Sequence, residues 1–80
     1  MAPSVRPGDQ VLVAPIRPGE ALREGDLLLA RRAGFLVVHR LVRKLEDAFV
    51  MRGDGAWSDD SPIPERDILA RVIDVRHAAK

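Results

Sequence analysis

The sequence predicts a small all-β domain, either a coiled sheet or a small barrel, built from about five or more short strands. Three observations support this prediction. Six prolines and six glycines divide the 80 residues into short segments. The apolar runs between them are rich in Val, Leu and Ile and have the length of strands. Tight turns separate neighbouring runs, which is typical of antiparallel β architectures.

Five runs are the expected strands. They are residues 10–13 (QVLV), 26–32 (DLLLARR), 35–45 (FLVVHRLVRKL), 48–52 (AFVMR) and 68–76 (ILARVIDVR). The third run alternates with a period of two, although neither of its faces is wholly apolar. A hairpin turn is expected around Gly34, and a second tight connection at 44–49. Residues 53–67 have the composition of a loop, with a helical turn beginning in PERD before the last strand.

A short pattern occurs twice. RPGDQVLV (6–13) and REGDLLLA (23–30) share Arg-x-Gly-Asp followed by an apolar run. Glycine adopts the positive φ that many turns need, and aspartate bonds back to the turn backbone. The pattern therefore predicts two similar turns, each leading into a strand.

Length and charge limit the classes of function. Eighty residues form one domain, 1–80, with a modest core. Thirteen basic residues against 12 acidic ones give a net charge of +1, so no nucleic-acid partner is expected. A weaker alternative is a nucleic-acid-binding barrel that uses a basic face. That face would contain Arg31, Arg32, Arg40, Arg43 and Lys44, but only two Phe and one Trp are available for base stacking.

Cysteine is absent, which excludes disulfides, thiolate zinc sites and a cysteine nucleophile. His39 and His77 have no metal-ligand spacing, and the acidic loop fails the EF-hand pattern, so neither a metal nor another cofactor is expected. No apolar run reaches the roughly 20 residues of a membrane span, and no signal peptide is visible. These observations predict a soluble chain with a cytoplasmic location.

Few side chains are candidates for chemistry. His39 lies inside an apolar strand, whereas His77 lies in a polar tail. Asp54, Asp59 and Asp60 crowd one glycine-rich loop. Ser4, Ser58 and Ser61 stand outside any nucleophile-elbow motif and are expected in turns. Composition and periodicity alone thus indicate a small all-β domain with one strand histidine and an acidic loop.

Taken together, the segments resemble the signal-peptidase/LexA-like superfamily of serine peptidases. The first family motif is Ser-Met-x-Pro, a spacer and Gly-Asp before an apolar strand, which Met1, Pro3, Gly8 and Asp9 match. REGDLLLARR is similar to the second Gly-Asp segment and FLVVHRLVRK to the strand that carries the base. MRGDGAWSDDSPIP resembles the acidic loop, and ILARVIDV the closing strand. The resemblance covers nearly the whole chain and keeps the motifs in order.

This resemblance implies a Ser-His-Asp endopeptidase that acts on an extended peptide or protein. His39 stands where the archaeal and endoplasmic-reticulum branch places its general base. Asp54 or Asp60 would orient it, and Met1 and Pro3 would lie in the substrate-binding segment. The branch usually has asparagines after Gly-Asp, where this chain has Gly55 and Ala56.

The family's nucleophilic serine is expected immediately before Met1, and the chain as written lacks it. Ser4 is three positions past Met1, and at ~3.3 Å per extended residue these three positions alone place its hydroxyl ~10 Å too far along the chain. The chain as written is therefore expected to be inactive. The alternative is a non-catalytic peptide-binding or protein-interaction module on the same fold. A homodimer is a further expectation, because so small a core leaves apolar surface for a second copy to cover.

Overall fold

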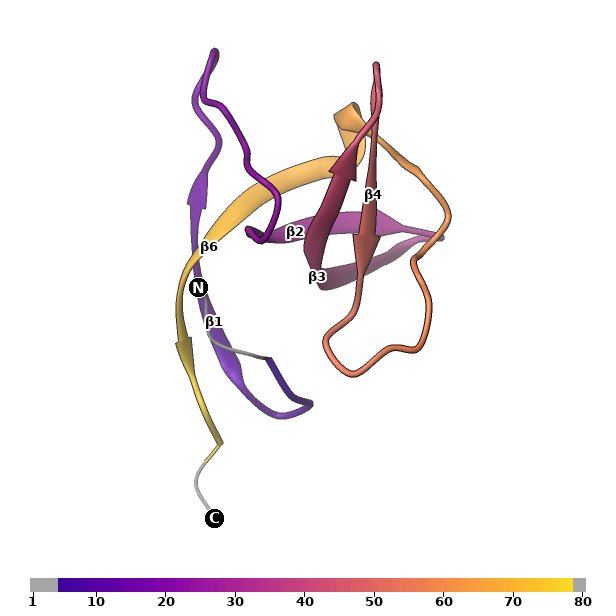
Figure 1. Ribbon diagram of the computed structural model, residues 1–80. Helices are drawn as coiled ribbons and strands as arrows, with labels where there is room; N and C mark the ends of the chain where they lie inside the picture. The colour runs from indigo at the N-terminus through magenta and orange to yellow at the C-terminus, as the bar shows by residue number, and fades with distance from the viewer. Residues whose placement is uncertain (1–4, 79–80) are drawn as a thin grey trace.

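The computed structural model describes residues 5–78 and confirms the all-β prediction (Figure 1). Within these residues, six strands form one antiparallel sheet in the order β1-β6-β2-β3-β4-β5. A single 3₁₀ turn, η1, precedes the last strand, where the sequence predicts a helical turn. The elements are β1 (Gln10–Pro15), β2 (Leu27–Arg32), β3 (Phe35–Lys44), β4 (Ala48–Arg52), β5 (Ile63–Pro64), η1 (Glu65–Asp67) and β6 (Ile68–Arg76).

The sheet is coiled and, over the described residues, is not closed into a barrel, because β1 and β5 remain as its two edges. β6 makes the coil, since it pairs with β1 over 70–76 and with β2 over 68–71. Both ladders contain a register shift, and such bulges bend a strand and increase its twist. Figure 1 shows β6 sweeping from β1 on one side to β2, β3 and β4 on the other.

Tight turns join the central strands as the sequence predicts. Between β2 and β3, Ala33 and Gly34 both have positive φ, 50° and 82°. Two consecutive positive φ values define the type I′ turn, whose twist suits a two-residue hairpin. Between β3 and β4, the Leu45 amide donates to the Ala48 carbonyl at 2.8 Å. The meander β2–β3–β4 is thus held by local contacts.

The Arg-x-Gly-Asp pattern forms the same turn at both predicted places. In each, the aspartate amide donates to the arginine carbonyl at 3.0 Å, and the arginine amide donates to the aspartate carboxylate at 2.9 Å. A third copy, Arg17-Pro-Gly-Glu20, repeats the arrangement with glutamate in place of aspartate. Gly8, Gly19 and Gly25 occupy the third position with φ of 89°, 79° and 97°.

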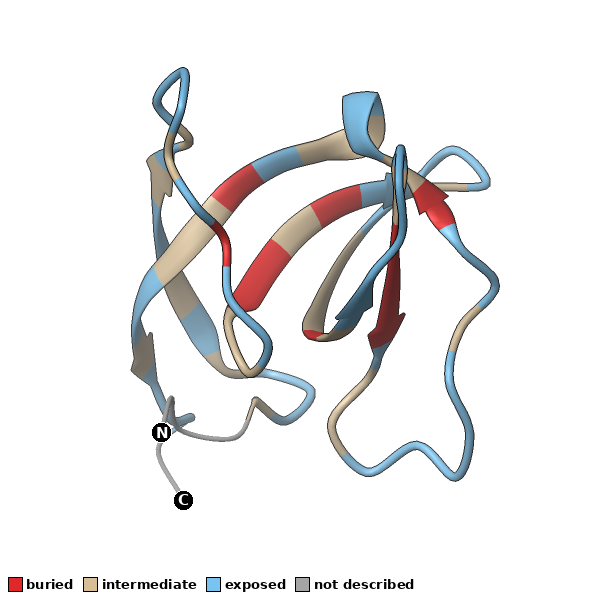
Figure 2. Cartoon of the chain, turned by 45° about the horizontal axis from the view of Figure 1, so that its top comes forward, coloured by how far each residue is buried: buried red, intermediate tan, exposed pale blue. Residues whose placement is uncertain are grey.

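The core lies inside the coil (Figure 2). Leu28, Ala30 and Met51 are fully enclosed, with exposed fractions of 0%. Ile63 of β5 also belongs to the core. The sequence predicts a loop here, because a strand of only two residues has no run of its own to indicate it. The buried cluster is Leu22, Leu28, Ala30, Leu41, Phe49, Met51 and Ile63.

Candidate active site

His39 lies on the side of β3 that faces the core. It is opposite Leu28 of β2 in the antiparallel register, and directly opposed residues share a face of the sheet. Leu28 is completely buried, whereas the His39 side chain is 21% exposed. The imidazole therefore lies at the rim of the core, where it is oriented by packing and still reaches solvent.

Asp60 is the carboxylate that binds His39. Its Oδ2 is hydrogen-bonded to His39 Nδ1, and its side chain is only 14% exposed. The Asp60 amide also donates to the Met51 carbonyl at 2.7 Å, which fixes this part of the loop against β4. An ionised carboxylate accepts the proton of Nδ1, so Nε2 of a neutral ring is left as the acceptor.

Asp54, the other aspartate expected near the base, binds Arg40 instead. Its two oxygens accept from Nε and Nη2 of Arg40, both at 3.0 Å. These bonds are the main reason that the pKa of Asp54 is lowered, and a bond from the Val5 amide adds to the effect. Arg40 follows His39 on β3, and consecutive strand residues point to opposite faces. The two aspartates of this loop therefore bind side chains on opposite faces of β3.

Gly53 packs directly against the His39 ring. A Cβ atom placed on Gly53 would lie 3.1 Å from His39 Nε2 and 3.3 Å from Cδ2. Its φ is not in the positive range, so the position requires glycine for space rather than for backbone conformation. In the sequence, Gly53 is recognisable only as part of the MRGDGAWSDDSPIP segment, because spacing alone does not show which side chain a glycine contacts.

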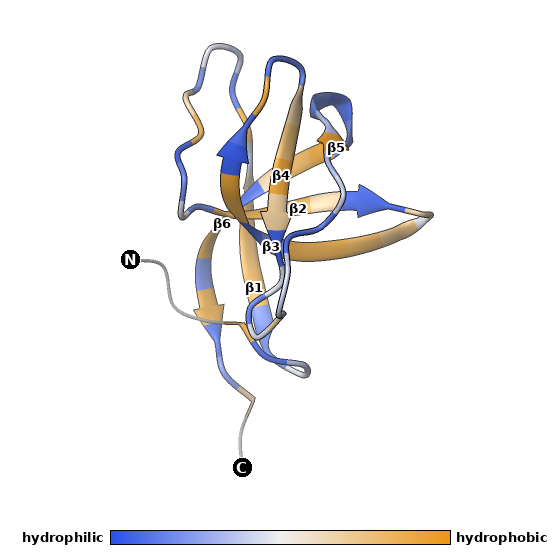
Figure 3. Ribbon diagram, turned by 45° about the vertical axis from the view of Figure 1, so that its right-hand side comes forward, coloured by the Kyte–Doolittle hydropathy of each residue, from blue (hydrophilic) through white to orange (hydrophobic). Residues whose placement is uncertain are grey.

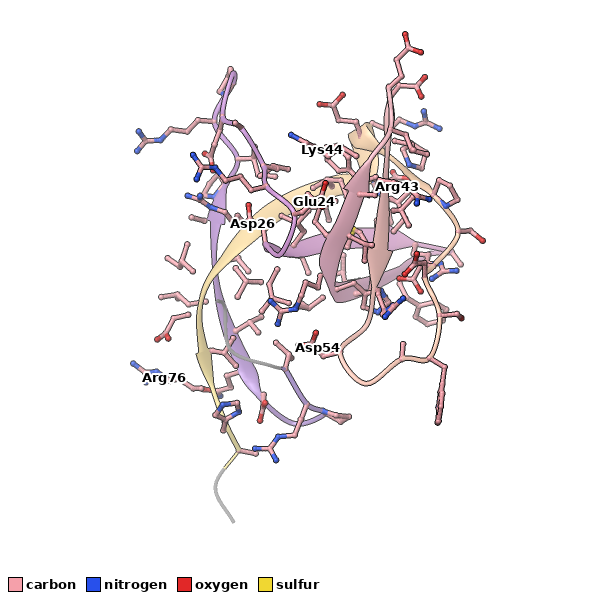
Figure 4. All side chains as sticks on the ribbon, in the orientation of Figure 1. Glu24, Asp26, Arg43, Lys44, Asp54 and Arg76 are labelled. Atoms are coloured by element: carbon pink, nitrogen blue, oxygen red, sulfur yellow. The ribbon has the colours of Figure 1, made fainter. Side chains whose placement is uncertain are left out.

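Met1, Pro3 and Ser4 lie outside the described residues. The described chain begins at Val5, whose amide donates to Asp54 Oδ2 at 2.9 Å. Figure 4 shows Asp54 pointing from the loop toward the rest of the sheet. The first described residue is therefore attached to the loop that also contacts His39. Ser58 and Ser61 are exposed in the same loop.

Two hollows flank these elements. One, of about 330 Å³, lies between the β2–β3 turn and the end of the acidic loop and is lined in part by Arg32, Gly34 and Ser61. The other, of about 360 Å³, is lined by apolar groups including Ile16, Phe49 and Ile68. Only the first lies beside Asp60, through its neighbour Ser61.

The basic residues of the alternative nucleic-acid face are largely engaged within the domain. Arg32 contacts Asp60 at 2.8 Å, Arg40 binds Asp54, and Lys44 Nζ donates to the Leu22 carbonyl at 2.8 Å. Arg31 lies 3.7 Å from Asp67. These ion pairs neutralise much of the positive charge that a phosphate backbone would require.

His77 belongs to a separate cluster near the two ends of the described chain. Its Nδ1 lies 2.9 Å from Asp9 Oδ2, and the Ala78 amide donates to Asp9 Oδ1 at 2.8 Å. Bonds from the amides of Ala78 and Arg6, followed by the His77 contact, lower the pKa of Asp9 from 3.8 to about 2. Within residues 5–78, no group of three acidic or histidine side chains is placed to hold a metal ion.

Comparisons with protein-family models, with curated proteins and with solved structures found no match to this chain. Across the part of the chain that the structure describes, no helix has the length and apolar character to cross a membrane.

Proposed function

We propose that this domain is the core of a serine endopeptidase, with His39 as general base and Asp60 as its orienting carboxylate. The observation that carries the proposal is the bond between Asp60 and His39 Nδ1. A base that is held by a carboxylate at one nitrogen presents the other nitrogen to a nucleophile. The sequence resemblance places that nucleophile, a serine, immediately before Met1.

The proposed substrate is an extended peptide that adds to the edge of β3 at residues 35–39, which no strand within the described residues pairs with. The ladder between β3 and β4 contains Arg40, Leu41, Arg43 and Lys44, so it begins just after His39. The preceding part of β3, residues 35–39, pairs with β2 in a hairpin that projects from the domain (Figure 3). Backbone groups on that edge are suited to β-augmentation by a peptide, and His39 stands at its end.

The test uses the chain with a serine added directly before Met1. A fluorogenic peptide with small residues at the cleavage site is the substrate. We expect measurable hydrolysis, and a loss of at least about 10³-fold in kcat in H39A, as for removal of a triad member. H77A is the matched control, because that histidine binds Asp9 in a different cluster. Hydrolysis that survives H39A would exclude the assigned base.

The same edge supports a second candidate, a non-catalytic peptide-binding module. In this case the peptide would perturb the backbone amides of 36–38 in a heteronuclear NMR titration, with the sequence unchanged and no product formed. Binding together with no hydrolysis by the serine-extended chain favours the module. Hydrolysis that depends on His39 favours the peptidase.

A further inference from the structure

Arg32, the last residue of β2, lies on the same face of the sheet as His39. In the β2–β3 register, Arg32 is opposite Phe35, Ala30 opposite Val37 and Leu28 opposite His39. Alternate residues of a strand share a face, and so do directly opposed residues. Arg32 of β2 and His39 of β3 therefore both lie on the core-facing side of the β2–β3 hairpin. The neighbouring Arg31 points to the other face and lies near Asp67.

Asp60 joins these two side chains. Its Oδ1 lies 2.8 Å from Arg32 Nη1, while its Oδ2 is bound to His39 Nδ1. The carboxylate is thus held at both oxygens, by one cationic group from β2 and one imidazole from β3. The Asp60 side chain is 14% exposed against 38% for Arg32, so the shared carboxylate is the more enclosed partner.

We infer that Arg32 is a positioning residue that acts on His39 through Asp60. A carboxylate bound only by His39 would be free to rotate about its Cβ–Cγ bond, because that torsion has a broad energy profile. The guanidinium binds the second oxygen in a charge-assisted contact and so fixes it. With the carboxylate plane fixed, Oδ2 stays directed at Nδ1, and the ring keeps its proton there with Nε2 directed to the site.

The relevance of this arrangement to catalysis rests on the proposed function, but the arrangement itself is measurable without a substrate. An ordinary surface ion pair would contribute little to stability and would leave the imidazole unaffected. A positioning role predicts a change in the His39 tautomer instead. The two interpretations therefore differ in the tautomer that they predict for His39 when Arg32 is replaced. Arg32 would affect this tautomer through Asp60, without direct contact with the ring.

The experiment is ¹⁵N NMR of the histidine rings at a pH where the imidazoles are neutral. The wild-type chain is expected to show His39 protonated at Nδ1. In R32M the fraction protonated at Nε2 should rise at least fivefold, approaching the pattern of D60N. R31M removes the same charge one residue away on the opposite face and should leave His39 unchanged. R32K, which keeps the charge without the planar fork, should restore part of the wild-type pattern.

A wild-type His39 pattern in R32M would overturn the inference. If R32M loses its dispersed amide spectrum, R32Q is measured in its place with the same expected shift. His77 provides an internal reference, because its partner Asp9 precedes β1, a strand that β6 separates from β2. In the serine-extended chain, R32M should lower kcat at least tenfold with little change in KM. Absence of hydrolysis by that chain would count against the proposed function, whereas the tautomer measurement would still decide the role of Arg32.

Discussion

Asp54 and Asp60 belong to the same loop and bind adjacent residues of β3, one on each face of the strand. Asp54 pairs with Arg40, and Asp60 with His39. Strand alternation makes this division necessary, because residues 39 and 40 cannot point the same way. The loop thus has two separate roles. One aspartate orients the proposed base, and the other joins β3 to the backbone at Val5.

We expect Asp54→Asn to loosen the start of the described chain. The substitution weakens a two-bond contact with Arg40 and the bond from the Val5 amide. These groups are partly exposed, so the expected loss in unfolding free energy is about 1 kcal/mol. Hydrogen exchange at the Val5 amide should accelerate more than exchange in β2. Asp59→Asn, which removes a more exposed pair with Arg52, is the control and should leave Val5 protected.

Gly53→Ala should displace the His39 ring. The added methyl group would meet Nε2 at 3.1 Å, which forces either the ring or the loop to move. We expect large changes in the His39 ring resonances and a loss of hydrolysis in the serine-extended chain. Gly19→Ala is a useful contrast, since that position is open but has a φ of 79°. It should cost about 1 kcal/mol of stability and leave His39 unchanged. Unchanged His39 resonances in Gly53→Ala would contradict the packing described here.

The contacts of Asp9 predict that the free energy of unfolding depends on pH in the acid range. Because the pKa of Asp9 falls from 3.8 to about 2 on folding, its ionised form stabilises the folded state. That contribution is complete above about pH 4 and disappears as the pH falls through 2. The difference in unfolding free energy between wild type and Asp9→Asn should therefore be present at pH 6 and shrink toward pH 2. A difference that stays constant over this range would show that Asp9 is not the titrating group.

Leu28→Ala should be among the most destabilising substitutions in the domain. Leu28 has an exposed fraction of 0% and lies opposite His39. Truncating a buried leucine costs about 2–5 kcal/mol, and a domain of this size has a total stability of only about 4–12 kcal/mol. Leu36→Ala, at a position that is 66% exposed, should change stability by less than about 0.5 kcal/mol. Equal effects in urea unfolding would contradict the assignment of the core.

Most of the sheet was predictable because its strands are bounded by strong local features. The turn at Gly34, the bounds of 48–52 and 68–76 and the 3₁₀ turn before β6 all agree with the sequence prediction. β5 was not predicted, because its pairing with β4 is set by the tertiary position of Ile63 rather than by a run of its own. The third turn ends at Glu20, so it does not match the Arg-x-Gly-Asp pattern and was not predicted.

The candidate site was predictable only in part. The family resemblance implied that His39 and either Asp54 or Asp60 belong to one site, but it left open which aspartate binds the histidine. The choice between the two aspartates depends on the path of the loop 53–62 relative to β3, which no local sequence pattern encodes. The contact between Arg32 and Asp60 joins residues 28 positions apart through the β2–β3 register and the path of the loop. Only the three-dimensional arrangement brings these two residues together.

The position of β6 has a consequence for the order in which the chain folds. β6 is last in the sequence yet lies between β1 and β2, and it is the strand that pairs with β1. The β2–β3–β4 meander closes through local hairpins, which form quickly, whereas the β1–β6 ladder closes a loop of more than half the chain. Among the described strands, β1 therefore leaves the ribosome first but has no pairing strand in the sheet until β6 emerges. We expect the meander to form first and β1 to join the sheet only with β6.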